Sequence, residues 1–326
     1  MKRKVILFGG AGYVGSMLVP KLVEKGFKVL VYDTFWYGRE VLKTADNLDL
    51  IQGDIRDLEL VKKSLEGVTD VIHLACISND PSFDLNPSLG KSINLLSFEP
   101  LVIAAKQQGI QRFIYASSSS VYGIKSEPNV TEELALNPLT DYSKFKAQCE
   151  KILLNYASND FICTILRPAT ICGYSVRQRF DLVVNILSNQ ALNNGQITVL
   201  GGSQFRPNLH ISDMVDAYLF VLNQKTSSIN REIFNINGEN LTLNQIAQKV
   251  SEITNVDKIE FKQTNDLRSY RVDASKIKTK LGFKPKLGVD EAILDLKKAL
   301  NEGKFKDPLN NSLYFNIKRM QELEIK

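Results

Sequence analysis

Histidine and cysteine are both scarce in this chain. Two histidines and four cysteines occur among 326 residues, and the cysteines at positions 76, 149, 163 and 172 show no CxxC spacing. A zinc site is therefore not expected, because protein zinc sites are built mainly from these two residue types. The cysteines follow no secretory signal pattern, so we interpret them as free thiols and expect a cytoplasmic location.

Long apolar runs are absent as well. No run approaches the roughly 20 residues that a transmembrane helix needs, so a membrane partner is not expected. The formal net charge is only +5, with an excess of basic residues in 262–326. Those basic residues are interleaved with acids, as in "DEAILDLKKALNEG". This pattern favours a solvated helix face over a nucleic-acid site, so no nucleic-acid partner is expected.

The first half of the chain alternates short β-branched runs with amphipathic segments. Strands are predicted at 4–9, 28–33, 48–54, 70–75, 111–117 and 161–169, and helices at 15–26, 97–109 and 141–158. Such alternation indicates βαβ units with right-handed crossovers. The predicted fold class is α/β, with a Rossmann-type doubly wound parallel sheet and a smaller mixed α/β C-terminal substrate domain.

After residue 170 the predicted strands and helices no longer alternate regularly. We predict a nucleotide-binding domain at 1–170 with a return segment around 207–223, and a substrate domain at 171–326. Within the return segment, Asp213 is the candidate cap of the helix "MVDAYLFVLN". Residues 307–326 match no motif, and the sequence assigns them no role.

The stretch "GGAGYVG" places Gly9, Gly12 and Gly15 at GxxGxxG spacing between a predicted strand and a predicted helix. Glycines there permit a tight turn and let a pyrophosphate approach the helix N-terminus. Asp33 ends the next strand, where its carboxylate can accept hydrogen bonds from the adenosine ribose and would repel the extra phosphate of NADP. The expected cofactor is therefore NAD. Asp54 ends the third strand and could reach the adenine edge.

A second constellation combines "YASSSSVYG" at 115–123 with "DYSKFK" at 141–146. Tyr142 and Lys146 are four residues apart and share one helix face. A tyrosine hydroxyl is a poor base at neutral pH, but a neighbouring ammonium and a positively charged nicotinamide would favour its phenolate. A tyrosine and a lysine at this spacing are common by chance. The Tyr142–Lys146 pair is a specific sign of a catalytic site here because it follows a serine-ended strand in a chain with a dinucleotide motif.

These motifs, together with "GDIRD", "HLA", "RPNLHISD" and "DLRSYRVDASK", resemble the extended short-chain dehydrogenase/reductase family. The resemblance is to its nucleotide-sugar branch, which includes UDP-galactose 4-epimerase. It implies that Ser118 and Tyr142 share a substrate hydroxyl and that Lys146 fixes the nicotinamide ribose. The further cofactor contacts that it implies are Tyr13, Val14, Thr34, Ile55, Leu74, Ala75, Cys76, Asn94, Ser117 and Pro168.

The resemblance also implies a site for a nucleotide-diphosphate sugar. Arg206 matches the arginine that grips the diphosphate, and Asp266 matches the acid that holds the nucleotide ribose. The other substrate contacts in this interpretation are Ser118, Ser119, Thr170, Arg179, Thr198, Leu200 and Arg268.

Three departures from the 4-epimerase pattern count against UDP-galactose itself. Gln263 replaces a second phosphate-binding arginine, Thr170 replaces an asparagine, and the loop between "VLGG" and "RP" is short. Arg268, or Arg177 or Arg179, could compensate for the missing arginine.

The four serines at 117–120 bear on the type of reaction that the chain catalyses. The related 4,6-dehydratases carry Thr-Asp-Glu where this chain has Ser118-Ser119-Ser120, so elimination lacks its acid and base and is disfavoured. The leading hypothesis is an NAD-dependent nucleotide-sugar epimerase acting through a keto-sugar. The alternative is an NAD(H)-dependent reductase or dehydrogenase of a keto-sugar nucleotide, and a non-catalytic NAD-binding protein is less favoured. The family also implies a homodimer through helices 97–109 and 141–158.

Overall fold

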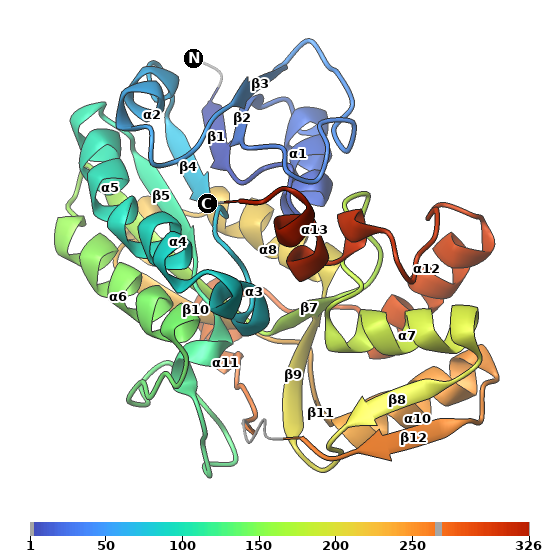
Figure 1. Cartoon of the computed structure of the whole chain (residues 1–326). Helices are drawn as coiled ribbons and strands as arrows, with labels where there is room; N and C mark the ends of the chain where they lie inside the picture. Colours follow the sequence, from blue (N-terminus) through green and yellow to red (C-terminus); the bar gives the residue numbers. More distant parts are fainter. Residues whose placement is uncertain (1–2, 265–268, 326) are drawn as a thin grey trace.

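The computed structural model describes residues 3–264 and 269–325. Its largest feature is a seven-stranded parallel sheet with strand order β10-β6-β5-β4-β1-β2-β3 (Figure 1). The strands are β1 (Lys4–Phe8), β2 (Lys28–Asp33), β3 (Leu48–Gln52), β4 (Asp70–His73), β5 (Arg112–Ala116), β6 (Ile162–Pro168) and β10 (Glu232–Ile236). The predicted Rossmann-type sheet is thus confirmed.

Helices cover both faces of this sheet. One hydrophobic cluster joins alternate strand residues such as Ile6 and Phe8 to α2 (Leu58–Ser64), α5 (Phe98–Gln107) and α6 (Asp141–Tyr156). The second cluster joins the intervening residues Val5 and Leu7 to α1 (Gly15–Glu24) and α8 (Ile211–Leu222). Burial on both faces explains why the strands are apolar at consecutive positions.

The segment between β4 and α5 folds into short helices that the sequence analysis did not predict. They are α3 (Asp80–Leu85), α4 (Pro87–Lys91) and a π-helical turn, η1 (Ser92–Leu96). The side chain of Asn79 accepts a hydrogen bond at the start of α3, and that of Asn86 does so at the start of α4. Each asparagine satisfies a helix N–H that has no partner within the helix.

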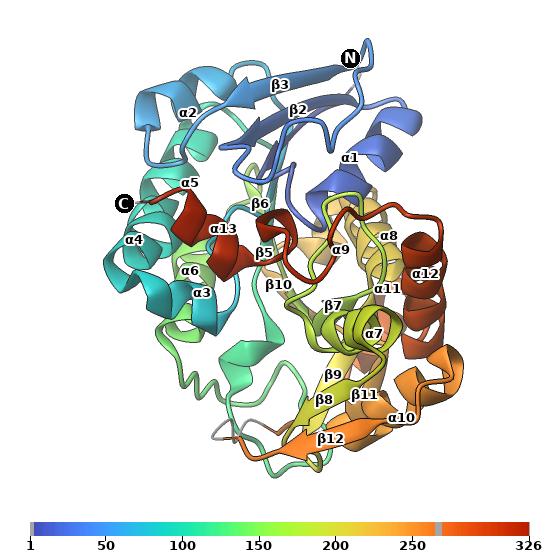
Figure 2. The same ribbon diagram turned by 45° about the vertical axis from the view of Figure 1, so that its right-hand side comes forward.

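The smaller unit contains a three-stranded sheet, a two-stranded sheet and three helices packed around one core (Figure 2). Its strands are β7 (Thr170–Cys172), β8 (Ile197–Leu200), β9 (Phe205–His210), β11 (Glu239–Thr242) and β12 (Ile259–Lys262), and its helices are α7 (Val183–Asn194), α10 (Leu243–Thr254) and α12 (Val289–Asn301). The remaining helices are α9 (Thr226–Ile229), α11 (Ser275–Leu281), α13 (Asn316–Glu322) and the 3₁₀ turns η2 (Ser119–Tyr122) and η3 (Ser312–Tyr314). Over residues 3–264 and 269–325, no helix combines the length and apolarity needed to cross a bilayer.

The chain returns to the large sheet after β9. Helix α8 packs against α1, and β10 adds the outermost strand beside β6. The return is therefore longer than the segment expected around 207–223. The helix does not begin with an Asp213 cap: the ring of His210 accepts from Ser212 N at 3.1 Å, whereas the Asp213 carboxylate accepts from the backbone N–H groups of Lys286 and Leu287. Asp213 thus anchors the loop before α12.

The turn from β1 to α1 requires glycine at its two ends. Gly9 has a φ of +81°, and a Cβ there would lie 2.6 Å from the backbone nitrogen of Ala75. A Cβ on Gly15 would lie 2.5 Å from the carbonyl oxygen of Gly10. The first turn of α1 therefore packs directly on the backbone that leaves β1, with no room for a side chain between them.

Gly15→Ala should cost about 3 kcal/mol of the free energy of unfolding, because the new methyl group would overlap backbone that cannot move aside. Gly26→Ala is the matched control at the other end of α1. Its φ is +82°, and a Cβ added there would meet no atom within 4 Å, so it should cost about 1–2 kcal/mol from backbone strain alone. Urea unfolding measures both values, and equal losses would contradict the packing argument.

A buried ion pair joins α6 to β6. The Nε and Nη2 atoms of Arg167 donate to the two carboxylate oxygens of Glu150 at 2.9 and 2.6 Å, and both side chains are 3% exposed. The Ser117 hydroxyl, at the end of β5, also donates to Glu150. Burial alone would lower the pKa of Arg167, but the hydrogen bonds and charge of Glu150 raise it. The pair connects three elements: α6, β6 and the end of β5.

Arg167→Met should lose about 3–5 kcal/mol of unfolding free energy, because it leaves the Glu150 charge buried and unpaired. The double variant Glu150→Met/Arg167→Met should lose less than the single variant, since no charge is then left without a partner. Chemical denaturation of the wild type, both single variants and the double variant gives the coupling energy. Losses that simply add would show that the pair does not act as a unit.

Candidate active site

A cavity of about 760 Å³ opens at the carboxyl ends of β1, β2, β4, β5 and β6 and extends to β8 and β9. Carboxyl ends of parallel strands are where open α/β sheets bind ligands. The predicted site residues that line it are Gly9, Gly12, Tyr13, Val14, Gly15, Asp33, Thr34, Asp54, Ile55, Leu74, Ala75, Cys76, Ser117, Ser118, Ser119, Tyr142, Lys146, Pro168, Thr170, Arg179, Thr198, Leu200 and Arg206. Asp266 and Arg268 lie outside the described residues.

The glycine turn and the end of β2 form one end of the cavity. A Cβ on Gly12 would meet a single protein atom, the carbonyl oxygen of Gly9 at 3.3 Å, so its open side belongs to the cavity. The Asp33 carboxylate accepts from Ala11 N at 2.9 Å and from Phe35 N at 2.8 Å. These bonds aim the carboxylate across the glycine turn. The arrangement fits a dinucleotide, with backbone for the phosphates and an acid for the ribose.

Burial and charge act in opposite directions on Asp33. Burial raises the pKa of its carboxyl group, while the backbone N–H donors and the nearby Arg177 guanidinium lower it. Burial has the larger effect, so the net pKa is above the usual value. A ribose hydroxyl that donates to this carboxylate would favour its charged form.

Asp54 and Ile55 lie beside this end of the cavity. The Asp54 carboxylate is engaged by Arg56, whose Nη2 donates to it at 2.7 Å and whose backbone N–H donates at 2.9 Å. Burial raises the pKa of Asp54, but the bonds from Arg56 more than offset this and the pKa is lowered. The side chain of Ile55 is 7% exposed and forms part of the wall.

Asn94 lies behind the wall. Its amide oxygen accepts from Ile77 N at 2.8 Å and its amide nitrogen donates to Ile77 O at 2.9 Å. Ile77 lines the cavity and Asn94 does not. The structure therefore gives Asn94 a role in holding the loop after β4.

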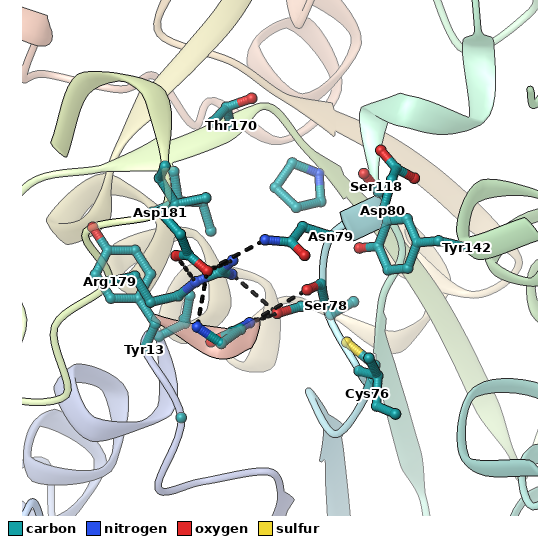
Figure 3. A pocket seen from close by; sticks show the side chains of 18 of the residues that line it. Tyr13, Cys76, Ser78, Asn79, Asp80, Ser118, Tyr142, Thr170, Arg179 and Asp181 are labelled. Carbon is teal, nitrogen blue, oxygen red and sulfur yellow. Dashed lines mark hydrogen bonds and ion pairs between the residues drawn. The ribbon is translucent and has the colours of Figure 1, made fainter. Parts of the chain in front are cut away.

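The catalytic candidates meet near the middle of the cavity. Tyr142 and Lys146 lie on the first two turns of α6, whose start is capped by Thr140. Ser118 follows β5, and its hydroxyl oxygen accepts from Ser120 N at 3.1 Å. Figure 3 shows the side chains of Ser118 and Tyr142 next to each other. Two hydroxyl groups can thus converge on one substrate oxygen.

Lys146 is 3% exposed and its Nζ donates to the carbonyl oxygen of Ala116 at 2.6 Å. The ammonium lies 5.9 Å from the centre of the Tyr142 ring. Burial, followed by the nearby Cys76 and Asp80, raises the pKa of Tyr142 well above its usual value, while Arg179 and the Ser118 hydrogen bond lower it. Burial therefore dominates the pKa of Tyr142, whereas the sequence suggested an acidifying influence of Lys146.

A polar cluster covers the side of the cavity opposite the sheet. The Arg179 guanidinium donates to the Asp181 carboxylate at 2.9 Å and to the Ser78 hydroxyl at 3.0 Å, as the dashed lines in Figure 3 show. Tyr13, in the glycine turn, donates its hydroxyl to Gly173 O at 2.7 Å. Arg179 thus joins the segment 177–181 to the loop after β4.

The remaining substrate candidates lie further along the cavity. Thr170 starts β7, and the backbone N–H of Thr198 donates to the Gln190 side chain at 3.0 Å. Leu200, on β8, is 56% exposed. Arg206, on β9, donates from Nη1 to Phe205 O at 3.1 Å. All four side chains come from the smaller unit, across the cavity from Tyr142.

Several lining residues were missed by the sequence analysis. They include Ser78, Asn79, Asp80, Asp181, Asn316 and Met320. The first three follow β4, where a motif ends and no further spacing marks the chain. Asn316 and Met320 come from the C-terminal segment, which carries no motif, so only the three-dimensional structure places them here.

Comparison with known proteins identifies relatives over nearly the whole chain. The family model described as the NAD dependent epimerase/dehydratase family matches residues 5–237. UDP-glucose 4-epimerase of Lactobacillus helveticus is 30% identical, covering 89% of this chain and 94% of the relative. UDP-N-acetyl-alpha-D-glucosaminuronate decarboxylase of Bacillus cytotoxicus is 26% identical, with 90% and 96% covered.

Among solved structures, UDP-glucuronic acid 4-epimerase of Bacillus cereus, in complex with UDP-glucuronic acid and NAD, superposes with a TM-score of 0.83. It is 26% identical, and the match covers 92% of this chain and 99% of that one. The span matched by the family model contains the glycine turn, Asp33, Ser118, Tyr142 and Lys146. The expected cofactor and the resemblance to the extended short-chain dehydrogenase/reductase family are confirmed. This chain belongs to the NAD-dependent epimerase/dehydratase family and is an NAD-dependent enzyme.

Proposed function

We propose that the protein is a nucleotide-sugar epimerase that inverts one carbon of the sugar through a keto-sugar intermediate. The observation that carries the proposal is the placement of the Ser118 and Tyr142 side chains next to each other (Figure 3) beside Lys146, with serine rather than an acid at positions 119 and 120. A 4-epimerase is also among the relatives that match the chain over almost its full length.

The chemistry follows from the positions of the three side chains. Tyr142 takes the proton of a sugar hydroxyl, and Ser118 holds the same oxygen by a hydrogen bond. Bound NAD supplies the acceptor, and then the donor, of the carbon-bound hydrogen. Lys146, buried between Ala116 O and the Tyr142 ring, is placed to bind the nicotinamide ribose and to stabilise the phenolate.

Removal of the carbon-bound hydrogen from one face of the sugar leaves a ketone, and its return to the other face inverts the carbon. The keto-sugar must turn within the cavity between these two steps. Ser119 and Ser120 carry no carboxyl group, so the side chains at the elimination positions supply neither acid nor base. The geometry therefore favours epimerisation over dehydration.

The substrate is proposed to be a nucleotide-diphosphate sugar. Arg206 lines the end of the cavity away from the glycine turn, where a guanidinium is suited to a diphosphate. Thr198 and Leu200 lie on β8, the strand that precedes β9 in the chain, and would flank the nucleotide. The known ligands of the relatives, UDP-glucuronic acid among them, support a sugar of this class.

A reductase or dehydrogenase of a keto-sugar nucleotide is the alternative, since the same three side chains serve a single oxidation or reduction. The two reactions differ in how they use the cofactor. An epimerase restores its NAD in every turnover, whereas a reductase consumes NADH in proportion to its product. The homodimer through the helices at 97–109 and 141–158 stays a prediction, which light scattering tests.

Tyr142→Phe should lower turnover by about 10²–10⁴-fold, because it removes the group that exchanges a proton with the sugar. The assay incubates purified protein, without added cofactor, with UDP-glucose, UDP-N-acetylglucosamine, UDP-glucuronic acid and GDP- or CDP-linked sugars. NMR of the sugar signals then identifies any epimer.

Tyr156→Phe is the matched control. Tyr156 lies at the other end of α6, and its exposed hydroxyl donates to Glu99 at 2.8 Å, away from the cavity. This variant should keep wild-type turnover. An absence of epimer from every sugar with wild-type protein would reject the proposed function, and stoichiometric consumption of NADH with a keto-sugar would favour the reductase.

A further inference from the structure

Arg177 is a buried arginine whose hydrogen bonding is incomplete. Its side chain is 4% exposed, and Nη2 donates to the Asn316 side chain at 2.6 Å. Its Nε and Nη1 atoms are buried without a hydrogen-bond partner among the described residues. Burial lowers the pKa of Arg177 to about 10, so the group is still charged at neutral pH. Unpaired N–H groups on a buried charge are costly and point to a ligand.

The position of Arg177 indicates which part of a ligand it meets. Its backbone N–H donates to the Ser16 hydroxyl at 3.3 Å, and the neighbouring Ser175 hydroxyl donates to Tyr13 O at 2.8 Å. The guanidinium lies 3.5 Å from the centre of the Tyr37 ring and lines the cavity. Its charge acts on Asp33. Arg177 therefore lies at the dinucleotide end of the cavity, beside the N-terminus of α1. It does not lie at the substrate end, where Arg206 is proposed to bind the diphosphate of the nucleotide sugar.

The C-terminal segment holds Arg177 in this place. Besides accepting from Arg177, Asn316 donates to the Ser78 hydroxyl at 3.0 Å, and its backbone N–H donates to Asp181 at 3.2 Å. Arg319 donates from Nε to Trp36 O at 2.5 Å. One short helix is thus bonded to the loops after β2 and β4 and to the segment 177–181.

This helix, α13, also forms part of the cavity wall. The side chains of Asn316 and Met320 line the cavity, and Met320 is 4% exposed and packs in the core. Figure 2 shows α13, in dark red, lying between the large sheet and α7. The segment therefore forms part of the wall of the cavity that contains the glycine turn.

We propose that Arg177 and α13 form a clamp that retains NAD, with the free nitrogens of Arg177 donating to its phosphate groups and α13 fixing Arg177 and covering the cofactor. The clamp rests on NAD binding and not on which sugar is converted. It gives the C-terminal segment a function and predicts that NAD remains bound through many turnovers, as an enzyme that restores its cofactor in each cycle requires.

The test measures how fast bound NAD exchanges. Purified protein is loaded with isotope-labelled NAD, desalted and mixed with excess unlabelled NAD, and the label that stays bound is followed over time. Arg177→Gln should exchange about tenfold faster or more, as expected for the loss of a hydrogen bond to a charged group. Asn316→Ala should also accelerate exchange, since it frees α13 while leaving Arg177 in the chain.

Lys318→Gln is the matched control, because Lys318 is an exposed residue of α13 that donates to Leu309 O, away from the cavity. It should exchange at the wild-type rate, and circular dichroism should show all three variants folded. Folded Arg177→Gln and Asn316→Ala proteins that exchange at the wild-type rate would overturn the clamp, as would wild-type protein that loses NAD on desalting. Slow wild-type exchange without conversion of any sugar would uphold the clamp and reject the proposed function.

Discussion

The buried ion pair between Glu150 and Arg167 holds together the elements that carry the catalytic side chains. Glu150 lies on α6, one turn beyond Lys146, and accepts from Arg167 on β6 and from Ser117 at the end of β5. Moving two charges out of water is favourable only when their geometry is well satisfied, so the pair tolerates little displacement. Because α6 and β5 are fixed to each other, Ser118 and Tyr142 meet at a defined separation. Hydroxyl groups that act on one substrate oxygen require this preorganisation.

The cavity combines two environments that serve different purposes. At the sheet, backbone atoms and small side chains leave room for a dinucleotide, and the carboxylate of Asp33 lies across the glycine turn, where it would meet the ribose. Across the cavity, the smaller unit contributes Thr170, Thr198 and Arg206. Tyr142 lies between the two, where burial raises the pKa of its hydroxyl. The positive charge of the oxidised nicotinamide would lower this pKa, and proton transfer by Tyr142 would then depend on cofactor binding.

Local sequence patterns predicted most of this architecture, and long-range contacts account for what they missed. The glycine turn, Asp33 and the pair of Tyr142 and Lys146 are readable because each depends on neighbours within one strand or helix. Asp213 resembles a helix cap in sequence, yet its carboxylate accepts from backbone 73 residues away. The role of the C-terminal segment could not be predicted from the sequence either, because its helix α13 depends on contacts with residues more than 130 positions earlier. Such contacts leave no periodic signal in the chain.

The central claim is that the hydrogen on the inverted carbon leaves and returns within the closed site. The most direct measurement is epimerisation in D₂O, with NMR or mass spectrometry of the product sugar. The account predicts an epimer that carries no solvent deuterium at the inverted carbon, since only the hydroxyl proton held by Tyr142 exchanges with water. Incorporation of deuterium at that carbon would show that it is deprotonated directly, and would contradict the roles given to NAD, Tyr142 and Ser118.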